Sequence, residues 1–256
     1  MNELQKKHMY RLRRVIGWLG LVLPISLVLT DSLMVGEFRV LSSISHYYYS
    51  AGSIFFTGTL ILFGVLLGAY QGYPNPQSSD QRAIRFLSDR SLTAISSISA
   101  FMTMLIPTQC DGSGHDFSFC CEGVGLVEPF LLGRSGNEFS DFHFLAAALF
   151  LASLALICMS QFTRSASMEG KFWRPVYQFL GWVVVGCLLA LAALFFFIFP
   201  KDSPLIDSHG GIVFWLESVA LWAFSIAWLI KGSKKWRQKS FPVLWRFLSP
   251  TRVPRF

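Results

Sequence analysis

The sequence predicts an all-α fold, a polytopic transmembrane bundle of about six helices with both termini in the cytoplasm. Hydrophobic residues make up 53% of the 256-residue chain and charged residues only 14%, whereas about a quarter of a soluble domain is charged. The apolar residues fall into six blocks, and a helix needs about 20 such residues to cross a bilayer. No block alternates as a barrel strand would, so helices are expected to satisfy the backbone in lipid.

We expect the bundle to occupy residues 1–231 and a basic, aromatic cytoplasmic tail to follow over 232–256. The first apolar block also fits a signal peptide, but it is long and no clear small-residue cleavage site follows, so we expect it to remain as a helix. The predicted helices cover residues 15–35, 53–70, 87–107, 142–162, 178–199 and 212–230.

Basic residues predict which side of the membrane each connection lies on. The two termini and the even-numbered connections carry 19 Lys and Arg, whereas the odd-numbered connections carry only Arg39, Arg134 and Lys201. Short cytoplasmic loops concentrate positive charge. The distribution therefore favours a bacterial inner-membrane protein with both ends in the cytoplasm.

The tail interleaves basic and aromatic side chains, a combination typical of segments that lie on an anionic leaflet. Nucleic acid also binds basic segments, but the adjacent membrane helix favours lipid, and we expect no nucleic-acid partner. The oligomeric state is not predicted. The residues expected to contact lipid headgroups are Lys234, Lys235, Trp236, Arg237, Lys239, Trp245 and Arg246.

The longest outer connection contains Cys110, Cys120 and Cys121. In an oxidising compartment Cys110 can pair with either of the other two, and the connectivity stays open. A zinc site with His115 and Asp116 is the alternative, although the spacing matches no zinc motif. Cys158 and Cys187 lie inside predicted helices, where packing is the expected role.

Ionisable residues gather toward the outer side, and they supply the candidate site. His46, His143, His209 and Glu217 are the candidate catalytic residues, and the three histidines are candidate zinc ligands. Glu217 lies inside an apolar block, where a carboxylate is costly and marks either a functional site or a hydrogen bond that joins two helices. Asp31 is closer to the interface, and a structural role is favoured there.

The segment Ser45-His46-Tyr47-Tyr48-Tyr49 has two interpretations. Tyrosine rings anchor at headgroup depth without any special function. Alternatively, the second helix extends outward to His46, so that His46, Ser50, Ser53 and Thr57 form one polar stripe that meets His143 and Glu217.

For packing, Gly64-x-x-x-Gly68 predicts a close helix contact, and Ser96, Ser99 and Thr103 can bond a neighbouring helix or their own carbonyls.

Three groups of short motifs resemble a family of uncharacterised bacterial six-helix membrane proteins, known as a domain of unknown function. They are Ser43–Tyr48 with Ala69–Tyr73, then Ile106–Thr108, then Phe214–Glu217 with Trp228–Gly232. In that family an Arg-Asp pair follows the Tyr-rich segment. Here Ala51-Gly52-Ser53 stands instead, so no role of that pair carries over. The resemblance implies six helices and no established activity, and it points to His46, Tyr47, Tyr48 and Glu217.

The sequence favours a non-enzymatic structural, sensing or partner-binding component, because it contains none of the common hydrolase or phosphate-binding motifs. An intramembrane metal-dependent lipid hydrolase is the alternative, with an outer-facing His/Glu site and zinc as cofactor. A small-solute or proton transporter that uses Glu217 and Asp31 is the third hypothesis, although the two halves show no internal repeat.

Overall fold

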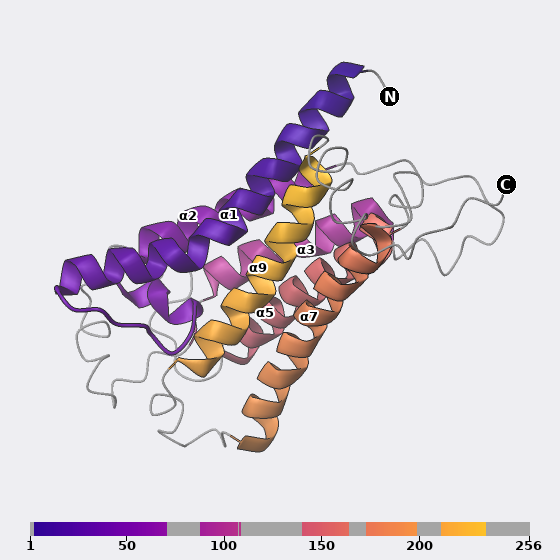
Figure 1. The fold of residues 1–256 in the computed structure, drawn as a ribbon. Helices are drawn as coiled ribbons and strands as arrows, with labels where there is room; N and C mark the ends of the chain where they lie inside the picture. The colour runs from indigo at the N-terminus through magenta and orange to yellow at the C-terminus, as the bar shows by residue number, and fades with distance from the viewer. Residues whose placement is uncertain are drawn as a thin grey trace, which may run out of the picture.

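The computed structural model describes residues 3–70, 88–106, 108, 140–163, 173–198 and 211–233, and the predicted fold class is confirmed. Within these ranges the chain is helical and has no strand (Figure 1). The six principal helices are α1 (Glu3–Val35), α2 (Ser53–Gly68), α3 (Asp89–Leu105), α5 (Ser140–Leu156), α7 (Trp173–Ala193) and α9 (Ile212–Gly232).

Each predicted range overlaps one of these helices, and the main difference is at the N-terminus. Helix α1 begins at Glu3 instead of residue 15, so that its basic first turns extend past the end of α9 (Figure 1). Helices α5 and α7 end in the π-helical turns Ile157–Phe162 and Leu194–Ile198. These turns carry the two helices to nearly the predicted ends.

Among the described residues, four helical stretches are long and apolar enough to cross a membrane: Lys7–Val35, Phe142–Phe162, Trp173–Phe197 and Ile212–Gly232. Helix α2 is apolar but has only 16 residues, a length of about 24 Å at 1.5 Å per residue. Helix α3 has 17 residues and contains four Ser and two Thr. Polarity therefore distinguishes α3 from the four longer spans.

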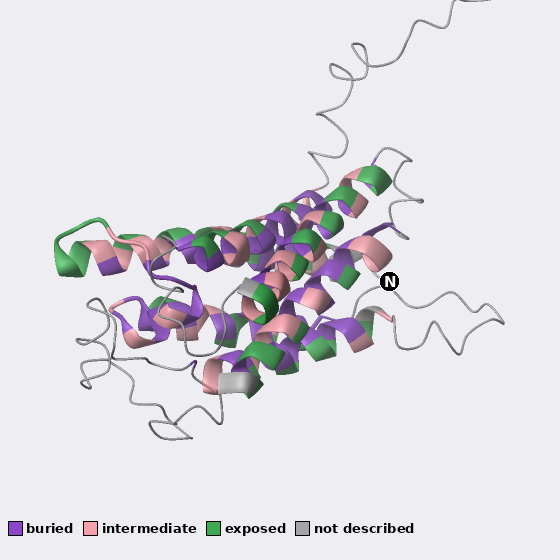
Figure 2. Ribbon diagram, turned by 90° about the horizontal axis from the view of Figure 1, so that it is seen from below, coloured by how far each residue is buried: buried purple, intermediate pink, exposed green. Residues whose placement is uncertain are grey.

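The six helices pack in a closed ring. Helix α1 contacts α2, and the contacts continue through α3, α5 and α7 to α9, which returns to α1. Each helix carries both buried and exposed residues (Figure 2), and many of the exposed residues are large and apolar. This distribution is typical of a bundle whose outer surface is solvated by lipid.

The predicted packing contacts around α3 are present. Ser97 donates a 2.6 Å hydrogen bond to the carbonyl of Gly64, and a Cβ added at Gly64 would lie 2.5 Å from the Phe101 ring. Ser96 Oγ lies 2.6 Å from Ser153 Oγ on α5, and Thr103 bonds the Ser99 carbonyl. Small and hydroxylated residues thus let α2, α3 and α5 approach closely.

Candidate functional site

The candidate site is built on residues 36–52, here called the cap segment, which connect α1 to α2. Its centre is a short 3-10 helix over Ser45–Tyr49, followed by Ser50 in extended conformation. Because α2 begins only at Ser53, the predicted outward extension of that helix to His46 is wrong, and His46, Ser50, Ser53 and Thr57 do not form one helical stripe. The extended Ser50 backbone interrupts the helical register between them.

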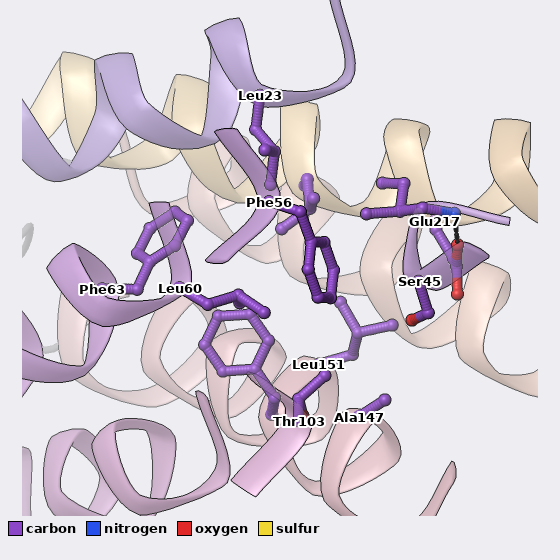
Figure 3. Close-up of a pocket in the computed structure, with 12 residues that line it drawn as sticks. Leu23, Ser45, Phe56, Leu60, Phe63, Thr103, Ala147, Leu151 and Glu217 are labelled. Atoms are coloured by element: carbon purple, nitrogen blue, oxygen red, sulfur yellow. Dashed lines mark hydrogen bonds between the residues drawn. The ribbon is translucent and has the colours of Figure 1, made fainter. Parts of the chain in front are cut away.

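Helix α9 holds the middle of the cap segment with two hydrogen bonds. The Ile44 N–H donates to Glu217 Oε2 at 2.7 Å, and the Phe214 N–H donates to the Ser42 carbonyl at 2.9 Å. The dashed line in Figure 3 marks the first bond. Glu217, predicted as a functional or helix-joining residue, thus accepts a hydrogen bond from a loop main chain.

Two tyrosines of the cap segment, Tyr47 and Tyr49, also bond to main-chain atoms. Tyr47 is buried, and its hydroxyl accepts a 3.2 Å bond from the Leu41 N–H; desolvation is the main cause that raises the pKa of this phenol to about 12. Tyr49 donates a 2.7 Å bond to the carbonyl of Thr108, and desolvation raises its pKa as well. These phenols remain protonated donors at neutral pH.

His143 on α5 joins the cap segment to the end of α3. Its Nδ1 lies 2.6 Å from the Ile106 carbonyl, and its Nε2 lies 2.8 Å from Ser45 Oγ. A carbonyl oxygen can only accept, so Nδ1 carries the proton in the neutral ring. Nε2 is then the unprotonated nitrogen, and the Ser45 hydroxyl donates to it. Both side chains are buried.

His46 directly follows Ser45 in the chain, and its ring faces two serines of the cap segment. Its Nδ1 lies 2.5 Å from Ser42 Oγ and 3.2 Å from Ser43 Oγ. Desolvation of the ring, with a smaller contribution from the nearby His143, lowers the pKa of His46 to about 4. His46 is therefore neutral at physiological pH.

A small, partly open cavity of about 40 Å³ lies beside Ser45 and Glu217. Figure 3 shows these two side chains at one end of the cavity and Leu60 and Phe63 at the other. The volume accommodates about three water molecules. The lining is mostly apolar and consists of Leu23, Ile44, Ser45, Phe56, Leu60, Phe63, Thr103, Ala147, Phe150, Leu151, Glu217 and Leu221.

Three of the four predicted site residues, His46, His143 and Glu217, therefore meet around residues 42–46. His209 lies outside the described residues, as do the candidate disulfide at Cys110, Cys120 and Cys121 and all the predicted lipid contacts of the tail. In the described part of the chain no three His, Cys, Asp or Glu side chains come together as a metal site would require. The zinc site at the three histidines thus stays a prediction that depends on His209, and the alternative zinc site with His115 and Asp116 lies outside the described residues.

No known protein family, curated protein or solved structure matches this chain.

Asp31 has a structural partner at the same end of the bundle. It is 1% exposed and forms a 2.7 Å ion pair with Arg39 of the cap segment. Cys158 and Cys187 are free and buried, in agreement with the packing role expected of them.

Two features of the structure were not predicted from the sequence. One is Ser45, which lies in the Tyr-rich segment but was not predicted as a site residue. The other is a pair of buried cations at the opposite end of the bundle. Arg13 bonds the Tyr70 hydroxyl at 2.6 and 3.1 Å, and Lys231 Nζ lies 5.3 Å from the centre of the Tyr177 ring. Their position in membrane helices is the signal that could have found them.

Proposed function

We propose that this chain is a multi-pass protein of the bacterial inner membrane, with both termini in the cytoplasm and the cap segment on the outer side. The four long apolar helices and the unequal distribution of Lys and Arg support this topology. Arg13 and Lys231 lie at the end of the bundle assigned to the cytoplasm. Arg39 lies at the opposite end, where it is ion-paired with Asp31.

We propose further that the protein is a structural, sensing or partner-binding component, in which α9 and α5 hold the cap segment in a fixed conformation. The Glu217–Ile44 hydrogen bond carries this proposal, because it places an ionisable side chain of a membrane helix on a loop main chain.

Hydrogen exchange of the protein in lipid nanodiscs tests this role. Residues 41–50 should exchange slowly in the wild type, and Glu217→Ala should speed their exchange while the helices remain protected. Glu217→Gln is the matched control, because its amide oxygen can still accept from Ile44. Fast exchange of residues 41–50 in the wild type would contradict the proposal.

The second candidate is an intramembrane lipid hydrolase, favoured by the meeting of His46, His143 and Glu217 around residues 42–46. A zinc ion would need three or four ligands, and the described residues alone do not gather three, so no zinc step is assigned. Zinc analysis of the purified protein tests this candidate. One equivalent that is lost in both His143→Ala and His209→Ala would support a zinc hydrolase. Wild-type protein without zinc would contradict it.

A further inference from the structure

Ser45 and His143 form a pair whose hydrogen-bond direction is fixed by a third group. The Ile106 carbonyl lies 2.6 Å from Nδ1 of His143 and can only accept, so that this carbonyl holds the proton on Nδ1. The lone pair of Nε2 therefore faces the Ser45 hydroxyl, 2.8 Å away. A nucleophile, a base and a group that orients the base are the elements that activate serine for covalent catalysis.

We propose that Ser45 is a nucleophilic hydroxyl that accepts a short acyl group from an ester, with His143 as its general base. The proposal goes beyond the structural role of the cap segment, and it requires no metal. Ser45 is one of the residues that line the cavity, so a carbonyl bound there would lie beside this residue. Ser42 and Ser43 of the cap segment do not line this cavity, and they face His46 instead.

The cavity selects the size of the acyl group. A volume of about 40 Å³ accommodates about three water-sized atoms, and an acetyl group has three heavy atoms. Beyond Ser45 and Glu217 the walls are mostly apolar, with Leu60 and Phe63 at the far end (Figure 3). These walls suit the methyl end of an acyl group. The substrate class is therefore a short-chain acyl ester, with its alcohol portion toward the opening.

The reaction is an acyl transfer in two balanced steps. Ser45 Oγ bonds to the acyl carbon while its proton moves to Nε2 of His143; the ester C–O bond then breaks, and the alcohol leaves with that proton. Water next attacks the acyl-serine and gives its proton to Nε2, which returns it to Ser45 Oγ as the carboxylic acid is released. Throughout, the Ile106 carbonyl keeps the Nδ1 proton in place.

Glu217 acts here as a positioning residue. Its Oε2 holds the N–H of Ile44, the residue directly before Ser45, at 2.7 Å. Loss of this bond would free the backbone that aims Ser45 at His143. Glu217→Ala should therefore slow acylation, and Glu217→Gln should restore most of the rate.

The test uses p-nitrophenyl acetate with the full-length protein in detergent, and tandem mass spectrometry locates the acetyl group. We expect an acetyl group on Ser45, a burst of p-nitrophenol, and a rate that falls as the pH drops and His143 becomes protonated. The p-nitrophenyl octanoate ester should react at least about tenfold more slowly, because an eight-carbon chain exceeds the cavity; tenfold corresponds to about 1.4 kcal/mol.

Variants separate a reactive pair from a structural hydrogen bond. Ser45→Ala and His143→Gln should lose the Ser45 label, and Ser43→Ala should keep it. Each variant is first shown to be folded by its thermal transition, and Ser45→Cys, which keeps a nucleophile, replaces Ser45→Ala if the latter does not fold. Labelling of Ser45 that is equal in folded His143→Gln, or acetyl groups found only on other residues, would overturn the proposal. The exchange experiment on residues 41–50 is independent of either result.

Discussion

The guanidinium of Arg13 holds the hydroxyl of Tyr70 in a two-point contact, with Nη2 2.6 Å and Nε 3.1 Å from the phenol oxygen. Arg13 is 1% exposed, and Tyr70 also packs edge-on against Trp228. The contact joins α1 to the end of α2 and, through Trp228, to α9. The hydroxyl oxygen of the Tyr70 side chain is the acceptor in both bonds.

Tyr70→Phe should therefore lower the free energy of unfolding by about 1–3 kcal/mol, since it removes an acceptor from a buried cation while the ring packing is retained. Thermal unfolding in detergent measures the loss. Arg11 is exposed on the same helix, so Arg11→Gln should leave the transition within about 0.5 kcal/mol of the wild type. Equal transitions for Tyr70→Phe and the wild type would show that the contact is not stabilising.

Two of the three glycines of α2, Gly58 and Gly64, should respond differently to an added methyl group. A Cβ at Gly64 would lie 2.5 Å from the Phe101 ring, whereas a Cβ at Gly58 meets nothing within 4 Å. Gly64→Ala should cost about 1–3 kcal/mol through overpacking. Gly58→Ala should be neutral or stabilise the helix by up to about 1 kcal/mol. A similar melting temperature for both variants would contradict the close approach of α2 and α3.

The ion pair between Asp31 and Arg39 should show coupling in a double-mutant cycle. Arg39→Gln leaves a carboxylate that is 1% exposed without its cation, and we expect a loss of about 1–3 kcal/mol. Asp31→Asn combined with Arg39→Gln should recover part of this loss, because the uncompensated charge is gone. Additive effects in the thermal transitions would indicate that the two side chains do not interact.

Acid should destabilise the protein through His46. Its folded pKa of about 4 lies below the value of about 6.5 expected in the unfolded chain, so the unfolded state binds the proton first as the pH falls. The contribution of His46 to the free energy of unfolding is thus fully present above about pH 6.5 and is lost as the pH falls toward 4. The loss from this side chain is no more than about 3 kcal/mol.

Thermal unfolding from pH 7.5 to 4.5 measures this decline, and His46→Asn should flatten the curve. His8 is exposed on α1, so His8→Asn serves as the matched control and should leave the pH dependence unchanged. A curve for His46→Asn that coincides with that of the wild type would rule out His46 as the source of this acid sensitivity.

The fold was predictable because hydrophobic length dominates it. Each apolar block of the required size became a helix, and Gly64 and Ser96 mark close packing by their small or hydroxylated side chains alone. The start of α1 was not predictable from hydropathy, since its first turns are helical although their residues are basic and not apolar. The low hydropathy of α3 is explained by its partners, because its hydroxyls bond Gly64 and Ser153 inside the bundle.

The site was only partly predictable. His143 and Glu217 were identifiable because ionisable groups at membrane depth are rare. Ser45 was not, because a serine becomes distinctive only through the histidine that it contacts, and that residue is 98 positions away. The break at Ser50 was also not evident, since Ser50-Ala51-Gly52 does not prohibit a continuous helix.

The central claim is that the bundle crosses the membrane with the cap segment outside. Cysteine accessibility in intact cells tests this claim most directly. Glu37 in the cap segment and Arg11 on α1 are both exposed and lie at opposite ends of the bundle. In a cysteine-free background a membrane-impermeant maleimide should label Glu37→Cys in intact cells and Arg11→Cys only after permeabilisation. The reverse pattern, or recovery of the unlabelled protein from the soluble fraction without detergent, would contradict this topology.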